Sequence, residues 1–171
     1  MHLTFRRFWR EGWQGERATA QDWEVHLSTL FPEVRLKRYV EVRQADASTR
    51  ELARALPALW RGLLYDLPSR QAAWQLVRDW SFEERLALYR ETPRLGLRAT
   101  IRGTALLPRC QELVAIAKSG LLALGSPEGA RLLDPLEQIA TSGRTVADQV
   151  LDAHARVNGD PARLVDELAL S

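Results

Sequence analysis

The chain has 171 residues, of which 46% are hydrophobic and 27% are charged. This length is enough for one domain with a hydrophobic core and too short for two ordinary domains, and the hydrophobic content argues against a disordered chain. The 24 Lys and Arg residues nearly balance the 22 Asp and Glu residues. Because the cations are spread along the chain and form no basic stripe, the sequence argues against a nucleic-acid-binding protein.

Other features bear on the cellular setting. No apolar run approaches the roughly 20 residues that a membrane-spanning helix needs. The N-terminal stretch MHLTFRRFWREGW lacks the apolar core of a secretory signal. The single cysteine, Cys110, excludes an internal disulfide framework. We therefore expect a cytoplasmic protein that does not contact a membrane.

Capping residues and apolar periodicity predict helices over most of the chain. Thr19 and Asp22 form a capping box before a helix that the Phe31-Pro32 pair ends. Pro57 is expected to kink or split the helix predicted at residues 48–66, because proline removes a backbone donor. Further capping boxes are Ser48–Glu51, Ser81–Glu84 and Thr145–Asp148. The other expected helices lie between Thr4 and Gly12, from Ser69 onward, and over 81–92, 107–124, 127–141 (interrupted at Pro135), 145–157 and 160–168.

One segment, residues 34–43 (VRLKRYVEVR), is predicted to be a single strand. Successive side chains of a strand point to opposite faces. The even positions are mostly aliphatic and the odd positions are polar or aromatic: Val34, Leu36, Arg38, Val40 and Val42 against Arg35, Lys37, Tyr39, Glu41 and Arg43. A lone strand leaves backbone donors and acceptors unpaired. We therefore expect it to join a sheet whose other strands come from a second copy, another chain or a missing N-terminal part.

The polar face of this segment is the candidate functional site. Glu41 and Arg43 point the same way, and a carboxylate oxygen is a suitable ligand for Mg²⁺. A neighbouring guanidinium can hold a phosphate with two hydrogen bonds. Arg35 and Lys37 extend the positive charge along the same face. This combination suits phosphoryl transfer; the alternative is an exposed face whose charges form cross-strand salt bridges.

Five segments in one order resemble the glutamate–cysteine ligases of the plant and proteobacterial type. They are FPEVRLKRYVEVRQADA at 31–47, ALPALWRGLLYD at 55–66, WQLVRDWSFEER at 74–85, PRLGLRATIRG at 93–103 and LLDPLEQIATSGRT at 132–145. The resemblance runs from about Leu3 to Leu151. It corresponds to only the C-terminal third or so of that family's chain.

The resemblance implies a fold and an activity. The family's fold resembles glutamine synthetase, with a curved antiparallel sheet and helices outside it. We thus expect a mainly α chain: a strand-bearing region at 1–47 and a helical bundle at 48–171, with one or few strands of an α+β ligase fold. The implied reaction is the ATP-dependent joining of the glutamate γ-carboxylate to the cysteine amine through a γ-glutamyl phosphate, the first step of glutathione biosynthesis.

The resemblance also assigns residues and partners. Glu41 matches a ligand of Mg²⁺, and Arg43 matches a catalytic residue that contacts the phosphates of ATP. Lys37 and Arg35 match positions beside them on the nucleotide-binding face. The substrates would be glutamate, cysteine and ATP, and the missing N-terminal part of the ligase or a second copy would complete the sheet.

Because a metal site needs several ligands, we expect the chain alone to be inactive. Two alternatives stay open at this stage. One is a related carboxylate–amine ligase with another amine substrate, and the other is a non-catalytic helical interaction domain or a truncated relic.

Overall fold

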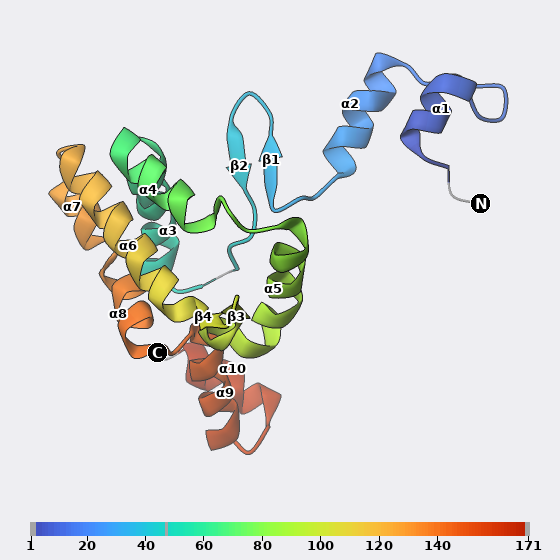
Figure 1. Ribbon diagram of the computed structural model, residues 1–171. Coiled ribbons are helices and arrows are strands. Elements are labelled where there is room, and N and C mark those ends of the chain that lie inside the picture. Colours follow the sequence, from blue (N-terminus) through green and yellow to red (C-terminus); the bar gives the residue numbers. More distant parts are fainter. Residues whose placement is uncertain (1–2, 47, 170–171) are drawn as a thin grey trace. The chain divides into compact units, whose positions relative to one another are not determined.

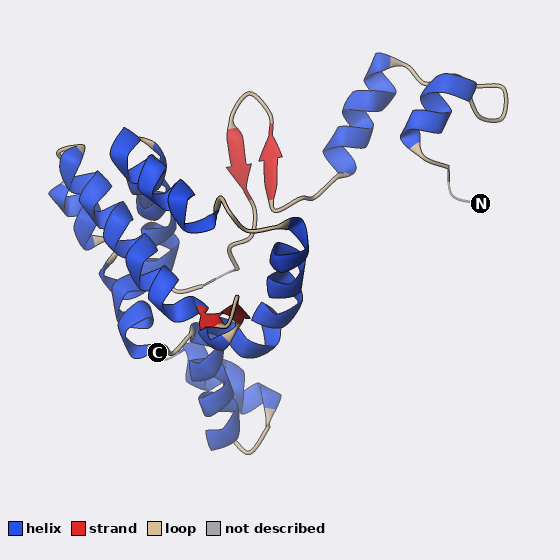
Figure 2. Ribbon diagram, viewed as in Figure 1, coloured by secondary structure: helices blue, strands red, loops and turns tan. Residues whose placement is uncertain are grey.

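The computed structural model describes residues 3–46 and 48–169 (Figure 1). It is 67% helix and 7% strand, which confirms the prediction of a mainly α chain with few strands (Figure 2). The chain divides into two compact units, Met1–Asp46 and Ala47–Ser171.

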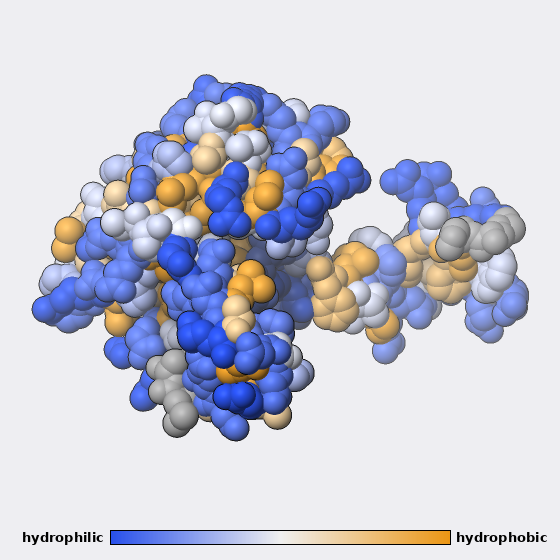
Figure 3. Space-filling model, turned by 90° about the horizontal axis from the view of Figure 1, so that it is seen from below, coloured by the Kyte–Doolittle hydropathy of each residue, from blue (hydrophilic) through white to orange (hydrophobic). Residues whose placement is uncertain are grey.

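The first unit contains two short helices, α1 (Phe5–Glu11) and α2 (Ala20–Thr29). Both predicted caps are present: the Thr4 hydroxyl accepts from the Arg7 backbone N–H, and a reciprocal capping box joins Thr19 and Asp22. The ring of Phe5 packs against Trp23 and His26, at centroid distances of 4.9 and 4.7 Å. No described residue of this unit is buried, and hydrophobic residues of its helices lie on the surface (right side of Figure 3).

The rest of this unit is a β-hairpin, and here the prediction of one strand over 34–43 is wrong. Strand β1 (Val34–Leu36) pairs antiparallel with β2 (Val40–Val42), with Val34 opposite Val42 and Leu36 opposite Val40. The chain bends at residues 37–39, where the Lys37 N–H donates to the Tyr39 carbonyl at 2.9 Å. A three-residue turn keeps even positions on one face, so the alternation of side chains is the same as in a continuous strand. The expected partner strand therefore lies within the same ten residues.

The second unit is helical apart from one small hairpin. In chain order its elements are α3 (Arg50–Leu64), α4 (Leu67–Val77), α5 (Phe82–Leu95), the 3-10 helix η1 (Gly96–Arg98), β3 (Thr100–Ile101), β4 (Thr104–Ala105), α6 (Leu106–Ala123), α7 (Pro127–Arg131), α8 (Asp134–Ser142), α9 (Val146–Arg156) and α10 (Pro161–Ala169). Its core gathers where α3, α6, α7 and α8 meet, around Leu63, Ala117, Leu121 and Leu133.

Most of the predicted helix caps are present. The capping boxes at Ser81 and Thr145 are both formed. Helix α3 is capped by Thr49, one residue after the predicted Ser48, and it runs through Pro57 without a break. Pro57 is exposed, so water can reach the carbonyl that loses its helical donor.

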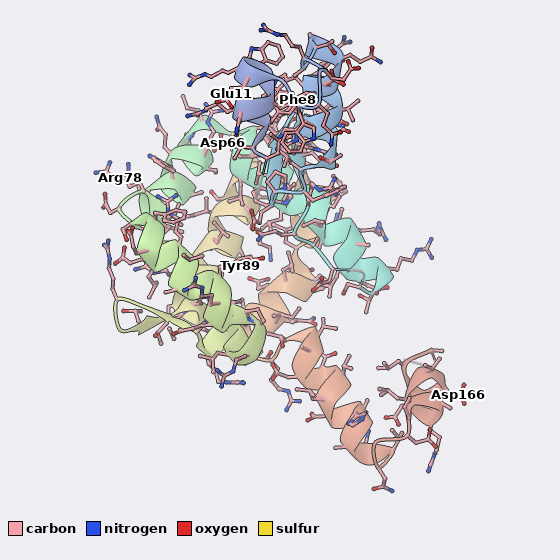
Figure 4. All side chains as sticks on the ribbon, turned by 90° about the vertical axis from the view of Figure 1, so that its right-hand side faces the viewer. Phe8, Glu11, Asp66, Arg78, Tyr89 and Asp166 are labelled. Atoms are coloured by element: carbon pink, nitrogen blue, oxygen red, sulfur yellow. The ribbon has the colours of Figure 1, made fainter. Side chains whose placement is uncertain are left out.

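Two other local predictions need correction. Helix α4 begins two residues before the predicted Ser69, because Asp66 caps it by accepting the Ser69 N–H at 2.9 Å (Figure 4). Residues 100–105, for which the sequence pattern predicts no strand, form the β3–β4 hairpin.

The β3–β4 hairpin is fastened to the start of α5 by one arginine. The Arg102 guanidinium donates to both carboxylate oxygens of Glu84 and to the Asp79 carbonyl. The hydrogen bonds from Arg102 are the main reason that the pKa of Glu84 falls to about 2. A second arginine, Arg109, lies over the Trp80 ring at 5.5 Å. The Arg102 contacts join the segments 74–85 and 93–103, and the Arg109 contact joins α6 to the first of them.

Helices α3 and α6 approach so closely that their backbones touch. Gly62 and Gly120 are both buried at the crossing. A Cβ on Gly120 would overlap the carbonyl oxygen of Gly62, and a Cβ on Gly62 would overlap that of Ala117. This contact needs residues without side chains, because side chains would hold the helices farther apart.

We expect Gly120→Ala to lower the free energy of unfolding of the second unit by about 1–3 kcal/mol, the usual range for overpacking a core. The overlap with the α3 backbone outweighs the roughly 1 kcal/mol by which alanine is favoured over glycine in a helix interior. Urea denaturation followed by circular dichroism measures it. The control is Ser119→Ala on the exposed side of the same helix; equal stability of the two variants would contradict the close contact.

Candidate functional site

The candidate site is built around Glu41 on β2. Arg35 lies directly opposite on β1, and Arg43 lies two residues after Glu41, just past the end of β2, so all three side chains share one face of the hairpin. The Arg35 Nε donates to Glu41 Oε2 at 2.9 Å. The Arg43 Nη1 donates to the other oxygen, Oε1, at 2.8 Å. One carboxylate thus holds two guanidinium groups.

Arg35 is the more enclosed of the two arginines, with a side chain 15% exposed against 28% for Arg43. Its Nη1 also donates to the carbonyls of Ser28 and Leu30, at 3.3 and 3.4 Å. These carbonyls belong to the C-terminal end of α2, where helical partners are lacking and a cation is favourable. Arg35 therefore ties the hairpin to α2, whereas the contacts of Arg43 with the described residues are to the hairpin itself and to one ring.

That ring is Phe31, between α2 and β1. The Cζ atom of Arg43 lies 4.9 Å from the ring centroid, and that of Arg35 lies 6.0 Å from it. Both distances are within the range of cation–π attraction. The sequence pattern indicates only a helix end at Phe31-Pro32 and does not predict this contact; the one available signal is an aromatic residue close before a basic strand.

The charges of the cluster are unequal, since two cations surround one anion. The hydrogen bond from Arg35 is the main cause that lowers the pKa of Glu41 below its ordinary value, and the charges of Arg35 and Arg43 act in the same direction. Glu41 is therefore ionised at neutral pH. The remaining positive charge can attract an anion, and the guanidinium edges offer paired N–H donors that match phosphate or carboxylate oxygens.

The structure brings together three of the four predicted site residues. Arg35, Glu41 and Arg43 form one connected cluster, as described above. Lys37 lies in the bend between the strands and is exposed, and among the described contacts its side chain does not join the cluster. The cross-strand salt bridge of the alternative interpretation is present as well, between Arg35 and Glu41.

The described residues do not by themselves form a magnesium site. Both oxygens of Glu41 are bonded to arginines, and within residues 3–46 and 48–169 no group of three or more His, Cys, Asp or Glu could hold a metal ion. Mg²⁺ prefers six oxygen ligands in near-octahedral geometry. Glu41 can contribute at most one carboxylate to such a site.

Comparison with known proteins decides the family. The profile of glutamate–cysteine ligase family 2 matches residues 6–167. The chain belongs to this family. It is 41% identical to the chloroplastic glutamate–cysteine ligase of Solanum lycopersicum over 140 residues. This matched stretch is 82% of this chain and 27% of that protein. It is 40% identical over 152 residues to the chloroplastic enzyme of Arabidopsis thaliana, 89% of this chain and 28% of that protein.

The chain spans only 27–30% of the length of the ligases that it matches.

The expectation of a cytoplasmic location is wrong, because these relatives are chloroplastic enzymes. In the part of the chain that the structure describes, no helix is both long and apolar enough to cross a membrane.

The pKa of Glu41 provides a test of the cluster. We expect Arg35→Gln to raise it more than Arg43→Gln does, because the Arg35 hydrogen bond is the largest cause of the lowered value. Since the folded pKa lies below the unfolded one, the ion pairs stabilise the hairpin above the unfolded pKa and lose this effect as the pH falls through the folded pKa. Carbon NMR of the Glu41 carboxyl group follows the titration. Arg38→Gln is the control, and a rise as large as that in Arg35→Gln would contradict the assigned contacts.

Proposed function

We propose that this chain supplies part of the active site of an ATP-dependent ligase that joins the γ-carboxylate of glutamate to the amine of cysteine. The observation that carries the proposal is the cluster of Arg35, Glu41 and Arg43 on one hairpin face, in a chain that belongs to the glutamate–cysteine ligase family. In this reaction ATP phosphorylates the glutamate γ-carboxylate, and the cysteine amine then displaces phosphate from the γ-glutamyl phosphate.

Each residue of the site has a proposed role. Arg43 directs its N–H groups at the phosphates of ATP and offsets the charge that develops during phosphoryl transfer. Arg35 holds the carboxylate of Glu41 in place across the hairpin and adds positive charge. Lys37 contributes a further cation at the hairpin bend. This grouping is supported by the shared face and by the unequal charges of the cluster.

Glu41 is proposed to contribute one carboxylate to a Mg²⁺ site whose other ligands come from elsewhere in the ligase. When bound, the ion would offset the negative charge of the ATP phosphates. Because no group of three or more His, Cys, Asp or Glu among the described residues could hold a metal ion, we propose that this chain alone does not catalyse the reaction.

The remaining part of the ligase, or a second copy of the chain, is the proposed partner. The aliphatic face of the hairpin supports this: Val34 and Val40 are exposed, and Leu36 is 81% exposed. A two-stranded hairpin is marginally stable on its own. A partner that covers this face would bury apolar surface and pair the free edges of β1 and β2.

A chimera tests the activity. It consists of the tomato enzyme with its matched portion replaced by this chain, and we expect it to form γ-glutamylcysteine in an ATP-dependent reaction. In the chimera, Arg43→Ala should lower turnover by about 10²–10³-fold, the usual cost of losing one contact to transition-state charge. A coupled assay for ADP release and detection of the product measure both effects.

The control variant is Arg38→Ala, which removes an arginine from the bend of the same hairpin. We expect its turnover to stay close to that of the unchanged chimera. A folded chimera that uses another amine instead of cysteine, or that shows no ATP-dependent reaction at all, would contradict the proposed function.

A second prediction concerns the partner. Leu36→Lys should weaken association of this chain with the rest of the tomato enzyme, or with itself, because it places a charge on the exposed aliphatic face. Co-purification and analytical ultracentrifugation measure the two associations. Leu151→Lys, at an exposed leucine of α9 (65% exposed), is the matched control; if both variants associate as well as the unchanged chain, the hairpin face is not the contact.

A further inference from the structure

Phe31 is a large apolar residue on the surface of its unit. It is 72% exposed, although burial normally stabilises a phenylalanine. No described residue of its unit is buried, so the ring does not belong to a core. The ring contacts the guanidinium groups of Arg43 and Arg35, and its centroid lies closer to the Cζ atom of Arg43 than to that of Arg35.

The backbone holds this ring beside Arg43. Pro32 follows Phe31 directly and restricts it to extended conformations. One residue further on, the Glu33 carbonyl accepts the backbone N–H of Arg43 at 2.9 Å, which continues the pairing of β1 and β2 beyond the strand ends. The segment that carries the ring is therefore bonded to the residue whose side chain lies over it.

The guanidinium of Arg43 is thus held in two different ways. Its edge donates to Glu41 Oε1 at 2.8 Å, and its carbon lies over the Phe31 ring at 4.9 Å. A phosphate oxygen would approach the same N–H edge and would compete with Glu41 for it. It would not compete with the ring, because cation–π attraction acts through the face of the aromatic system.

We propose that Phe31 is a positioning residue for Arg43. Its ring keeps the guanidinium oriented while the N–H edge exchanges the Glu41 carboxylate for the phosphate of a nucleotide. This inference rests on the proposed role of Arg43 in binding the phosphates of ATP. Without the ring, the Arg43 side chain would lose one of the two contacts that it makes with described residues, and the entropy cost of ordering this flexible side chain would then oppose binding.

The experiment uses the purified 171-residue chain and tripolyphosphate as the probe, with affinity measured by calorimetry. Arg43→Ala should abolish specific binding. Phe31→Leu should weaken binding roughly two- to fivefold, the equivalent of an exposed cation–π contact. Phe31→Tyr keeps an aromatic face and should restore affinity to near that of the unchanged chain. Phe82→Leu, at an equally exposed phenylalanine of α5 (71% exposed), should have no effect.

A second readout needs no ligand. In nitrogen-labelled chain, the Nε–H signal of Arg43 should carry a ring-current shift that Phe31→Leu removes and Phe31→Tyr retains. The backbone amide spectrum of each variant checks that the hairpin is still formed.

The outcomes separate the two proposals. If Arg43→Ala loses binding while Phe31→Leu matches the unchanged chain and leaves the Nε–H signal unmoved, the role of Phe31 is overturned and the proposed function stands. If Phe31→Tyr is as weak as Phe31→Leu, the ring does not act through its aromatic face, and the inference is again wrong. If Arg43→Ala binds tripolyphosphate as well as the unchanged chain, the phosphate role of Arg43 fails, and both proposals fall together.

Discussion

The two oxygens of a single carboxylate, that of Glu41, hold the hairpin face together. Each oxygen accepts from a different arginine, at 2.9 Å for Arg35 and 2.8 Å for Arg43. Without the carboxylate, two like charges would lie side by side on a face that has no core beneath it, and their repulsion would be screened only by solvent. The arrangement leaves the cluster with surplus positive charge. It also means that a cation at Glu41 or an anion at Arg43 would bind to a group that already takes part in a hydrogen bond.

This dependence on ion pairs follows from how unevenly burial is distributed. In the second unit, α3 and α6 touch backbone to backbone at Gly62 and Gly120, and a leucine- and alanine-rich core surrounds the crossing. In the first unit no described residue is buried, so the hairpin rests on its backbone pairing, its bend and the Glu41 cluster. The candidate site residues therefore belong to the part of the chain with the least hydrophobic stabilisation. An additional polypeptide over the aliphatic face, as proposed, would stabilise the same segment that carries the chemistry.

The sequence predicted the helices better than the strands, and the reason is physical. A capping box such as Ser81–Glu84 is completed within one turn, so its residues reveal it. Small errors arose where neighbours compete: Ser48 and Thr49 can both accept a backbone N–H, and in the structure it is Thr49 that caps α3. The hairpin was harder, because an odd-numbered bend preserves the alternation of side chains and leaves no mark in the pattern. The shared face of Glu41, Arg35 and Arg43 was predicted because it follows from alternation, whereas the contact of Arg35 with Glu41 arises from the pairing of β1 with β2. The contact with Phe31 was not, since it depends on the path of the chain before the strand.

The hairpin also explains why the two interpretations of residues 34–43 are not exclusive. A salt-bridged face and an anion-binding face use the same groups, but they differ in which partner occupies the guanidinium edge. Arg35 donates to Glu41 and to two carbonyls near the end of α2, so releasing it would break several bonds at once. Arg43 has one carboxylate contact and one ring contact, so exchanging its edge partner breaks fewer. If an anion is to bind, Arg43 is therefore the arginine that can turn toward it, while Arg35 keeps Glu41 fixed. A lysine at position 43 could supply the charge but not the planar group that a ring and an oxyanion can contact at the same time.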